Sequence, residues 1–311
     1  MKSRVFVLFV VLATVVFAAP VSSHGYQPDP AKQKESRRDS ARAERDNARA
    51  ERDNARAERD SARAHDADQD NDGQSQRDLP ERDEINQTLN LANGARVEVS
   101  GINGMVEIET ANTSTAEIHI VRSANNRADL EYHRIVVEQA ADRLVVRGEK
   151  ENDRTRNGHG HEVRQRVMLK IPRQVDLSTS GINGKVTVGA IDGPVRLSGI
   201  NGKVDEAQAR GYSDISGING RVSITVTGLG ERGIHVSGIN GGVELKFAED
   251  LNADLDVSAV NGAVNTDVSN VTVQGKLDRS NFRAKIGSGG SPISISGVNG
   301  RVRLSRVGNS G

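Results

Sequence analysis

The chain has 311 residues, and its 42 basic and 42 acidic residues give a formal net charge of zero. The lack of cysteine excludes disulfides, thiolate catalysis, iron–sulfur clusters and cysteine-based zinc sites. Balanced charge and the lack of tryptophan argue against nucleic-acid binding, which relies on basic patches and aromatic stacking platforms.

Residues 1–23 predict a signal peptide. Two basic residues precede Val5–Ala19, a nearly unbroken apolar run of 15 residues. That run is short for a bilayer core of about 30 Å, and small residues follow it. Cleavage after Ala18 and cleavage after Ser23 both fit the pattern. We therefore expect an exported chain, periplasmic or extracellular at the cell surface, with no transmembrane segment once the signal is removed.

Residues 24–84 predict a charged low-complexity spacer. The heptad Ala-Arg-Ala-Glu-Arg-Asp-Asn begins at Ala41 and Ala48, and a copy ending in Ser begins at Ala55. Its alanines lie about 200° apart on a helix, so they form no single apolar seam for a coiled coil. A solvated single helix and a disordered tract both fit, and we expect a tether in either case.

The spacer ends in a candidate calcium loop. Asp68, Asp70, Asp72 and Gly73 match the first half of an EF-hand loop, in which carboxylates bind a hard cation. The second half departs from the pattern, because Leu79 stands where a bidentate Glu belongs. A weak calcium site and an acidic flexible linker are the two interpretations. No other cofactor is expected.

From residue 85 to residue 307 the chain is built from repeats of Ser-Gly-Ile-Asn-Gly-x-Val, with five matching units and two variants. The repeated pairs are Asn103–Gly104, Asn183–Gly184, Asn201–Gly202, Asn219–Gly220, Asn240–Gly241, Asn261–Gly262 and Asn299–Gly300. From Asn183 onward the asparagines are 18, 18, 21, 21 and 38 residues apart. A degenerate copy at Ser280–Ile286, with Arg283 in the asparagine place, would divide the last interval.

Apolar and polar residues alternate on both sides of each Asn-Gly pair, which predicts an all-β protein. The pair itself suits a turn whose two central residues have positive φ. One interpretation is a series of β-hairpins in an antiparallel meander. The other, which we favour, is a β-solenoid of 18–21-residue rungs with a second corner near Ile191–Gly193. Stacked rungs would place the asparagines in an amide ladder.

Residues 113–176 lack the repeat but contain four strand-like runs: Ile118–Val121, Ile135–Val137, Leu144–Val146 and Val167–Ile171. A charged loop follows the third run. Its His159 and His161 could hold a transition metal weakly, although a solvated hairpin tip is the simpler interpretation.

The repeated Gly-Ile-Asn-Gly core, the strand at Arg96–Val99 and the stretch from Asn252 to Leu304 resemble the bacterial putative-adhesin β-strand-repeat family, a domain of unknown function. The resemblance covers roughly residues 88–307. It implies an exported, elongated β-repeat domain with a role in adhesion, and it carries no functional residues over to this chain.

We find no sequence motif of a hydrolase nucleophile, a zinc protease or a phosphate-binding loop. We therefore expect a non-enzymatic protein that presents an extended surface for binding or adhesion to an unknown envelope or surface partner, with no catalytic residues. One alternative is a periplasmic scaffold or regulatory partner of an envelope complex, with residues 24–84 as its tether. The other is a polysaccharide-active β-helical enzyme, which the shortage of aromatic residues disfavours.

Overall fold

The computed structural model describes residues 79–140, 142–150, 163–208, 210–248, 251–268, 271–274 and 281–307. These residues belong to one compact unit, Asp78–Gly311. The predicted signal peptide, the calcium candidates Asp68, Asp70 and Asp72, and most of the predicted spacer lie outside the described residues. Within the described part, no helix is long and apolar enough to cross a membrane.

The described residues are all-β apart from one short helix, and 20 strands belong to a single hydrogen-bonded sheet. The elements are β1 (Glu81–Asn90), β2 (Arg96–Ser100), β3 (Gly104–Ala111), β4 (Thr115–Ala124), α2 (Arg127–Tyr132), β5 (His133–Ala140), β6 (Arg143–Lys150), β7 (Val163–Pro172), β8 (Asp176–Ser180), β9 (Val186–Ile191), β10 (Val195–Ser198), β11 (Asn201–Gln208), β12 (Ser213–Val226), β13 (Ile234–Asn240), β14 (Val243–Phe247), β15 (Ala253–Val260), β16 (Val264–Thr266), β17 (Val271–Gln274), β18 (Phe282–Ile286), β19 (Ser291–Asn299) and β20 (Val302–Arg306).

Strands of successive repeats pair in parallel, with equivalent residues side by side. Asn201 lies opposite Asn219 where β11 pairs with β12. Asn219 in turn lies opposite Asn240 where β12 pairs with β13. The parallel register rules out an antiparallel meander for these strands, because a hairpin would pair the two sides of one Asn-Gly turn with each other.

The parallel strands form two layers. The first layer runs in the order β6, β2, β8, β10, β12, β13, β19 and β15. The second layer runs in the order β7, β3, β9, β11, β12, β14, β20 and β16. Strand β12 belongs to both layers, because its 14 residues continue through the Asn219–Gly220 corner.

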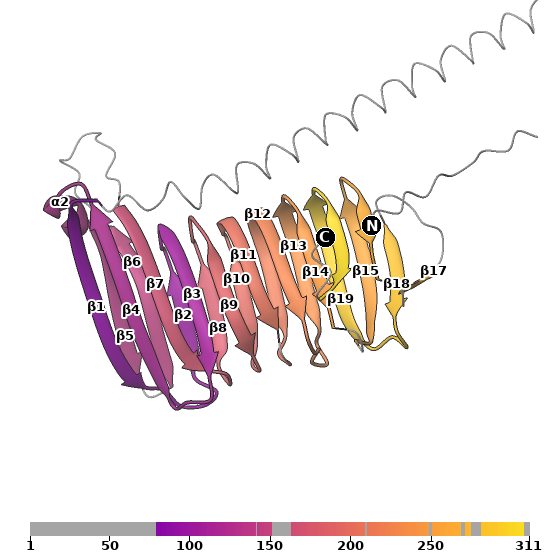
Figure 1. Cartoon of the computed structure of the whole chain (residues 1–311), viewed down its shortest axis with the longest axis horizontal. Helices are drawn as coiled ribbons and strands as arrows, with labels where there is room; N and C mark the ends of the chain where they lie inside the picture. The colour runs from indigo at the N-terminus through magenta and orange to yellow at the C-terminus, as the bar shows by residue number, and fades with distance from the viewer. Residues whose placement is uncertain are drawn as a thin grey trace, which may run out of the picture. The chain divides into compact units, whose positions relative to one another are not determined.

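The order of strands departs from chain order at both ends (Figure 1). Strand β2 lies between β6 and β8, and β3 lies between β7 and β9, so the first repeat is inserted beside a later segment. At the other end β19 follows β13, and β15 stacks beyond β19. Spatial neighbours therefore cannot be inferred from the sequence spacing of the repeats alone.

Antiparallel strands close both ends of the parallel stack. Strand β4 pairs antiparallel with β7 and β1 with β4, while β5 pairs antiparallel with β6. At the far end β18 pairs antiparallel with β15, and β17 with β18. The expected degenerate repeat at Ser280–Ile286 is therefore wrong, because Phe282–Ile286 runs against its neighbour. Arg283 lies opposite Asp256 and contacts it at 2.9 Å instead of joining the asparagines.

The inward side chains of the two layers form one core. Each isoleucine of the five matching units is about 1% exposed: Ile102, Ile182, Ile200, Ile218 and Ile239. The valine that ends each unit is also buried, and both belong to one continuous cluster with the other apolar residues. Full burial of such a side chain contributes about 1.5–3 kcal/mol, so the inward pattern stabilises the stack along its length. The strands expected in residues 113–176 are confirmed as parts of β4, β5, β6 and β7.

Candidate binding surface

The corner of each repeat depends on the glycine that follows serine. Gly181, Gly199 and Gly217 have φ values of +62°, +58° and +62°, in the left-handed region that glycine adopts without strain. In the variant unit at residues 258–264, Ala259 stands in the same place with φ +52°. It is the one described non-glycine residue with positive φ. The predicted turn with positive φ at both Asn and Gly is therefore wrong, since no described asparagine has positive φ.

The glycine that follows asparagine allows the backbones of neighbouring repeats to approach closely. A Cβ atom on Gly202 would lie 2.1 Å from the carbonyl oxygen of Gly184, and one on Gly220 would lie 1.9 Å from that of Gly202. The same contact recurs from Gly241 to Gly220, at 1.8 Å. Real side chains do not reach such distances, so the second glycine sets the backbone spacing of the stack.

The predicted amide ladder is confirmed, and it includes all seven repeat asparagines. Asn219 Nδ2 donates to Asn201 Oδ1 at 2.9 Å, and Asn201 Nδ2 donates to Asn183 Oδ1 at 3.0 Å. The remaining steps are Asn183 to Asn103, Asn240 to Asn219, Asn299 to Asn240 and Asn261 to Asn299, between 2.9 and 3.2 Å. Each asparagine is exposed, so the ladder forms a continuous row of amides on the outer surface.

A second outward row follows the amide ladder at the variable x position of the repeat. Its residues are Met105, Lys185, Lys203, Arg221, Gly242, Ala263 and Arg301. Because side chains two apart on a strand point to the same side, this row lies beside the asparagines on the outer face of the second layer. Lys203 is opposite Arg221 in the register of β11 and β12. We call this set the cation row.

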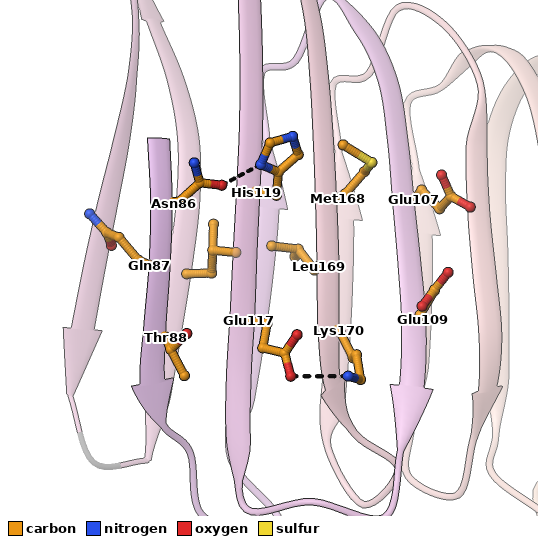
Figure 2. Close-up of a pocket in the computed structure, with 11 residues that line it drawn as sticks. Asn86, Gln87, Thr88, Glu107, Glu109, Glu117, His119, Met168, Leu169 and Lys170 are labelled. Carbon is orange, nitrogen blue, oxygen red and sulfur yellow. Dashed lines mark hydrogen bonds and ion pairs between the residues drawn. The ribbon is translucent and has the colours of Figure 1, made fainter. Parts of the chain in front are cut away.

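A groove crosses the outer face of the second layer near its N-terminal end, over β1, β4, β7 and β3 (Figure 2). It has a volume of about 420 Å³. Two lines of side chains form its walls, Asn86–His119–Met168–Glu107 and Thr88–Glu117–Lys170–Glu109. Lys170 Nζ contacts Glu117 at 3.0 Å, and His119 Nδ1 hydrogen-bonds Asn86 Oδ1. Sequence reasoning missed this groove, because its walls come from strands whose pairing no repeat motif indicates.

One buried polar pair interrupts the apolar core. Glu206 on β11 is 3% exposed and lies between Val188 and Ile224 in the register of its neighbours. Ser213, at the start of β12, is fully buried and donates its hydroxyl to Glu206 Oε1. The other carboxylate oxygen, Oε2, has no hydrogen-bond partner among the described residues. Burial raises the pKa of Glu206 to about 7, and the hydrogen bond from Ser213 acts in the opposite direction.

The other predicted site residues fall outside what the structure describes. His159 and His161 lie outside the described residues, as do the calcium candidates at 68, 70 and 72. In the described ranges no group of three or more His, Asp or Glu side chains is placed to hold a metal ion. The described sites are therefore the amide ladder, the cation row and the groove.

No family model matches the chain, and no curated protein matches it in sequence. Among solved structures it is similar to a putative cell adhesion protein from Clostridium sporogenes, at 13% identity and a TM-score of 0.36, covering 73% of this chain and 100% of the other. A putative adhesin from Bacteroides fragilis matches at 10% identity, TM-score 0.29, over 73% and 99%. A putative lipid binding protein from Parabacteroides distasonis matches at 9% identity, TM-score 0.23, over 72% and 97%.

Proposed function

We propose that this chain is an exported, non-enzymatic β-solenoid that presents an extended repetitive surface for binding or adhesion. The parallel register supports the solenoid, because residues 18 or 21 positions apart lie side by side from β8 to β13. In such a fold each rung contacts mainly its neighbours, so the surface can be lengthened without a new core.

The observation that carries the binding function is the repetition of exposed side chains in register. The amide ladder joins seven asparagines by hydrogen bonds of 2.9 to 3.2 Å. Neighbouring strands are about 4.8 Å apart, so identical donors and acceptors recur at that interval along one face. A regular surface of this kind suits a ligand that is itself regular, such as a polymer or an ordered cell-envelope layer.

Binding is tested with the full chain, labelled and added to intact cells and to isolated envelopes of a strain that lacks it. We expect saturable binding that an excess of unlabelled chain displaces. Binding that rises linearly with concentration, with no displacement, would contradict the proposal. Fractionation of cells that express the chain then separates surface display from a periplasmic scaffold.

The enzyme alternative is tested in parallel, because a polysaccharide-active protein would also bind envelopes. The purified chain is incubated with envelope polysaccharides, and the release of reducing ends is followed over time. We expect release no faster than with heat-denatured chain. Time-dependent release that scales with protein concentration would favour the enzyme.

A further inference from the structure

The cation row has a composition that the fold itself does not require. Its seven positions hold four cations and no anion, although the flanking motif is otherwise nearly constant. The side chains point outward, so core packing does not select them. Lys185, Lys203 and Arg221 come from three successive rungs, and Arg166 extends the row beyond Met105 in the register of β7 and β3.

Stacking like charges on adjacent strands costs stability, because the charged groups face each other at strand spacing. Asp205 offsets part of this cost, since its carboxylate lies 3.8 Å from Lys185 Nζ and 3.4 Å from Lys203 Nζ. One carboxylate is shared by two ammonium groups, and these lysine side chains remain 36% and 44% exposed. The two ammonium groups therefore keep an excess of positive charge over this carboxylate, and an anion in solution can reach them.

The amide ladder runs parallel to the cation row, two residues away along each repeat. Six of the seven ladder asparagines use one N–H for the next asparagine, whereas Asn103 donates to the carbonyl of Val163. Each side chain therefore has a second N–H, and all seven side chains are exposed. The outer face thus offers lines of amide donors and of cations that both follow the stacking direction. Neither line contains an aromatic side chain, so the surface lacks platforms for stacking nucleic-acid bases.

We propose that this face binds a linear acidic polysaccharide laid along the stacking direction. Its carboxylate or sulfate groups contact Lys185, Lys203 and Arg221, and its hydroxyl groups hydrogen-bond the amide ladder. The charge complementarity selects an anionic polymer, and the amides favour a hydroxyl-rich chain over a polyphosphate. The inference rests on the proposed binding function and names the ligand class for it.

The test uses the full chain and polygalacturonate as the acidic probe, with neutral dextran and single-stranded DNA as comparisons. The row variant is Lys185→Gln with Lys203→Gln and Arg221→Gln. The matched control removes the same charge from exposed cations outside the row, on β6, β10 and β18, through Arg143→Gln, Arg196→Gln and Arg283→Gln. A third variant, Lys185→Arg with Lys203→Arg, preserves the charge of the row.

We expect polygalacturonate to bind, dextran not to bind, and affinity to fall as salt rises from about 0.05 to about 0.3 M. The row variant should weaken binding about tenfold, while the control and the arginine variant change it less than about twofold. Circular dichroism should show the same β signal in all three variants, because the substitutions are on exposed side chains.

Equal loss in the row and control variants would overturn the proposal, as would binding of single-stranded DNA at least as tight as that of polygalacturonate. A chain that binds envelopes saturably but ignores polygalacturonate refutes this inference and leaves the proposed function standing. A chain that binds neither refutes both.

Discussion

Ser213 donates its hydroxyl to the carboxylate of Glu206 across the core, joining the first layer to the second in a place where neighbouring rungs are apolar. In the same register Ser213 lies between Val195 and Ile234. A polar pair therefore stands in one repeat where the neighbouring repeats have apolar residues. Its effect on the stability of the chain can be measured.

The first prediction concerns pH. The pKa of Glu206 is raised from 4.5 to about 7 in the folded chain. Between these values the folded state keeps a proton that the unfolded state releases, so stability from this group is present below pH 4.5 and is lost as pH rises through 7. The free energy of unfolding, taken as wild type minus Glu206→Gln, should fall by about 3 kcal/mol from pH 4.5 to about pH 8. Urea denaturation of both proteins at the two pH values measures this difference in the free energy of unfolding. A difference that does not change with pH would contradict the prediction.

A second prediction replaces the pair with the residues of the adjacent rung. Glu206→Val combined with Ser213→Val removes a buried carboxylate and its donor together, which is neutral or stabilising when the shapes match. At neutral pH we expect a gain of about 1–4 kcal/mol. Ser213→Val alone should destabilise and move the pKa of Glu206 higher still, because it removes the one interaction that lowers it. Denaturation of the wild type, Ser213→Val and the double variant measures these changes. A double variant less stable than Ser213→Val would refute the argument.

The third prediction compares glycine with alanine at the position after serine, where the backbone is left-handed. Gly217→Ala should destabilise by about 1–2 kcal/mol, because φ is +62° while the nearest atom to the new Cβ is an ordinary 3.6 Å away. Ala259→Gly should have the opposite sign and stabilise by roughly 0.5–1 kcal/mol, because it relieves the same strain. Thermal melting provides both values. The same sign for both substitutions would show that backbone strain does not govern this corner.

The fourth prediction concerns the second glycine. Gly220→Ala should cost much more than Gly217→Ala, more than about 4 kcal/mol, because its Cβ would lie 1.9 Å from the carbonyl oxygen of Gly202. The backbone of two rungs would have to separate, which also breaks neighbouring hydrogen bonds. The comparison uses the solubility and the unfolding transition of the two alanine variants. A similar loss of stability in both would count against close approach as the reason for glycine at position 220.

A fifth prediction tests stacking directly. Deleting residues 202–219 joins Asn201 to Gly220 and removes one 18-residue period together with the buried Glu206–Ser213 pair. The flanking rungs can then dock on each other, because each rung contacts its neighbours. We expect a soluble, β-rich chain with a cooperative melt. Aggregation, or a melt without a cooperative transition, would show that the strands do not stack as interchangeable rungs.

Much of the local structure could be predicted from the sequence. The alternation around each Asn-Gly pair indicated strands, and the constant Ile and Val positions are the buried ones. The amide ladder followed from identical asparagines at the same place in every repeat. The reason for each glycine could not be predicted in this way, because the sequence does not show whether a glycine is needed for a left-handed φ, as at Gly217, or for a close approach, as at Gly220.

Tertiary structure alone decided which repeat lies beside which. Nearly identical units have nearly identical faces, so the repeat makes stacking favourable but leaves every order of rungs about equally good. The connections break this equivalence. The antiparallel strand β4 and its partner β7 place β3 between β7 and β9, and the hairpin of β17 and β18 covers β15 beyond β19. The groove depends on the placement of β4 and β7 beside β3. The Glu206–Ser213 pair depends on a contact across the core between β11 and β12. No local pattern in the sequence encodes either arrangement.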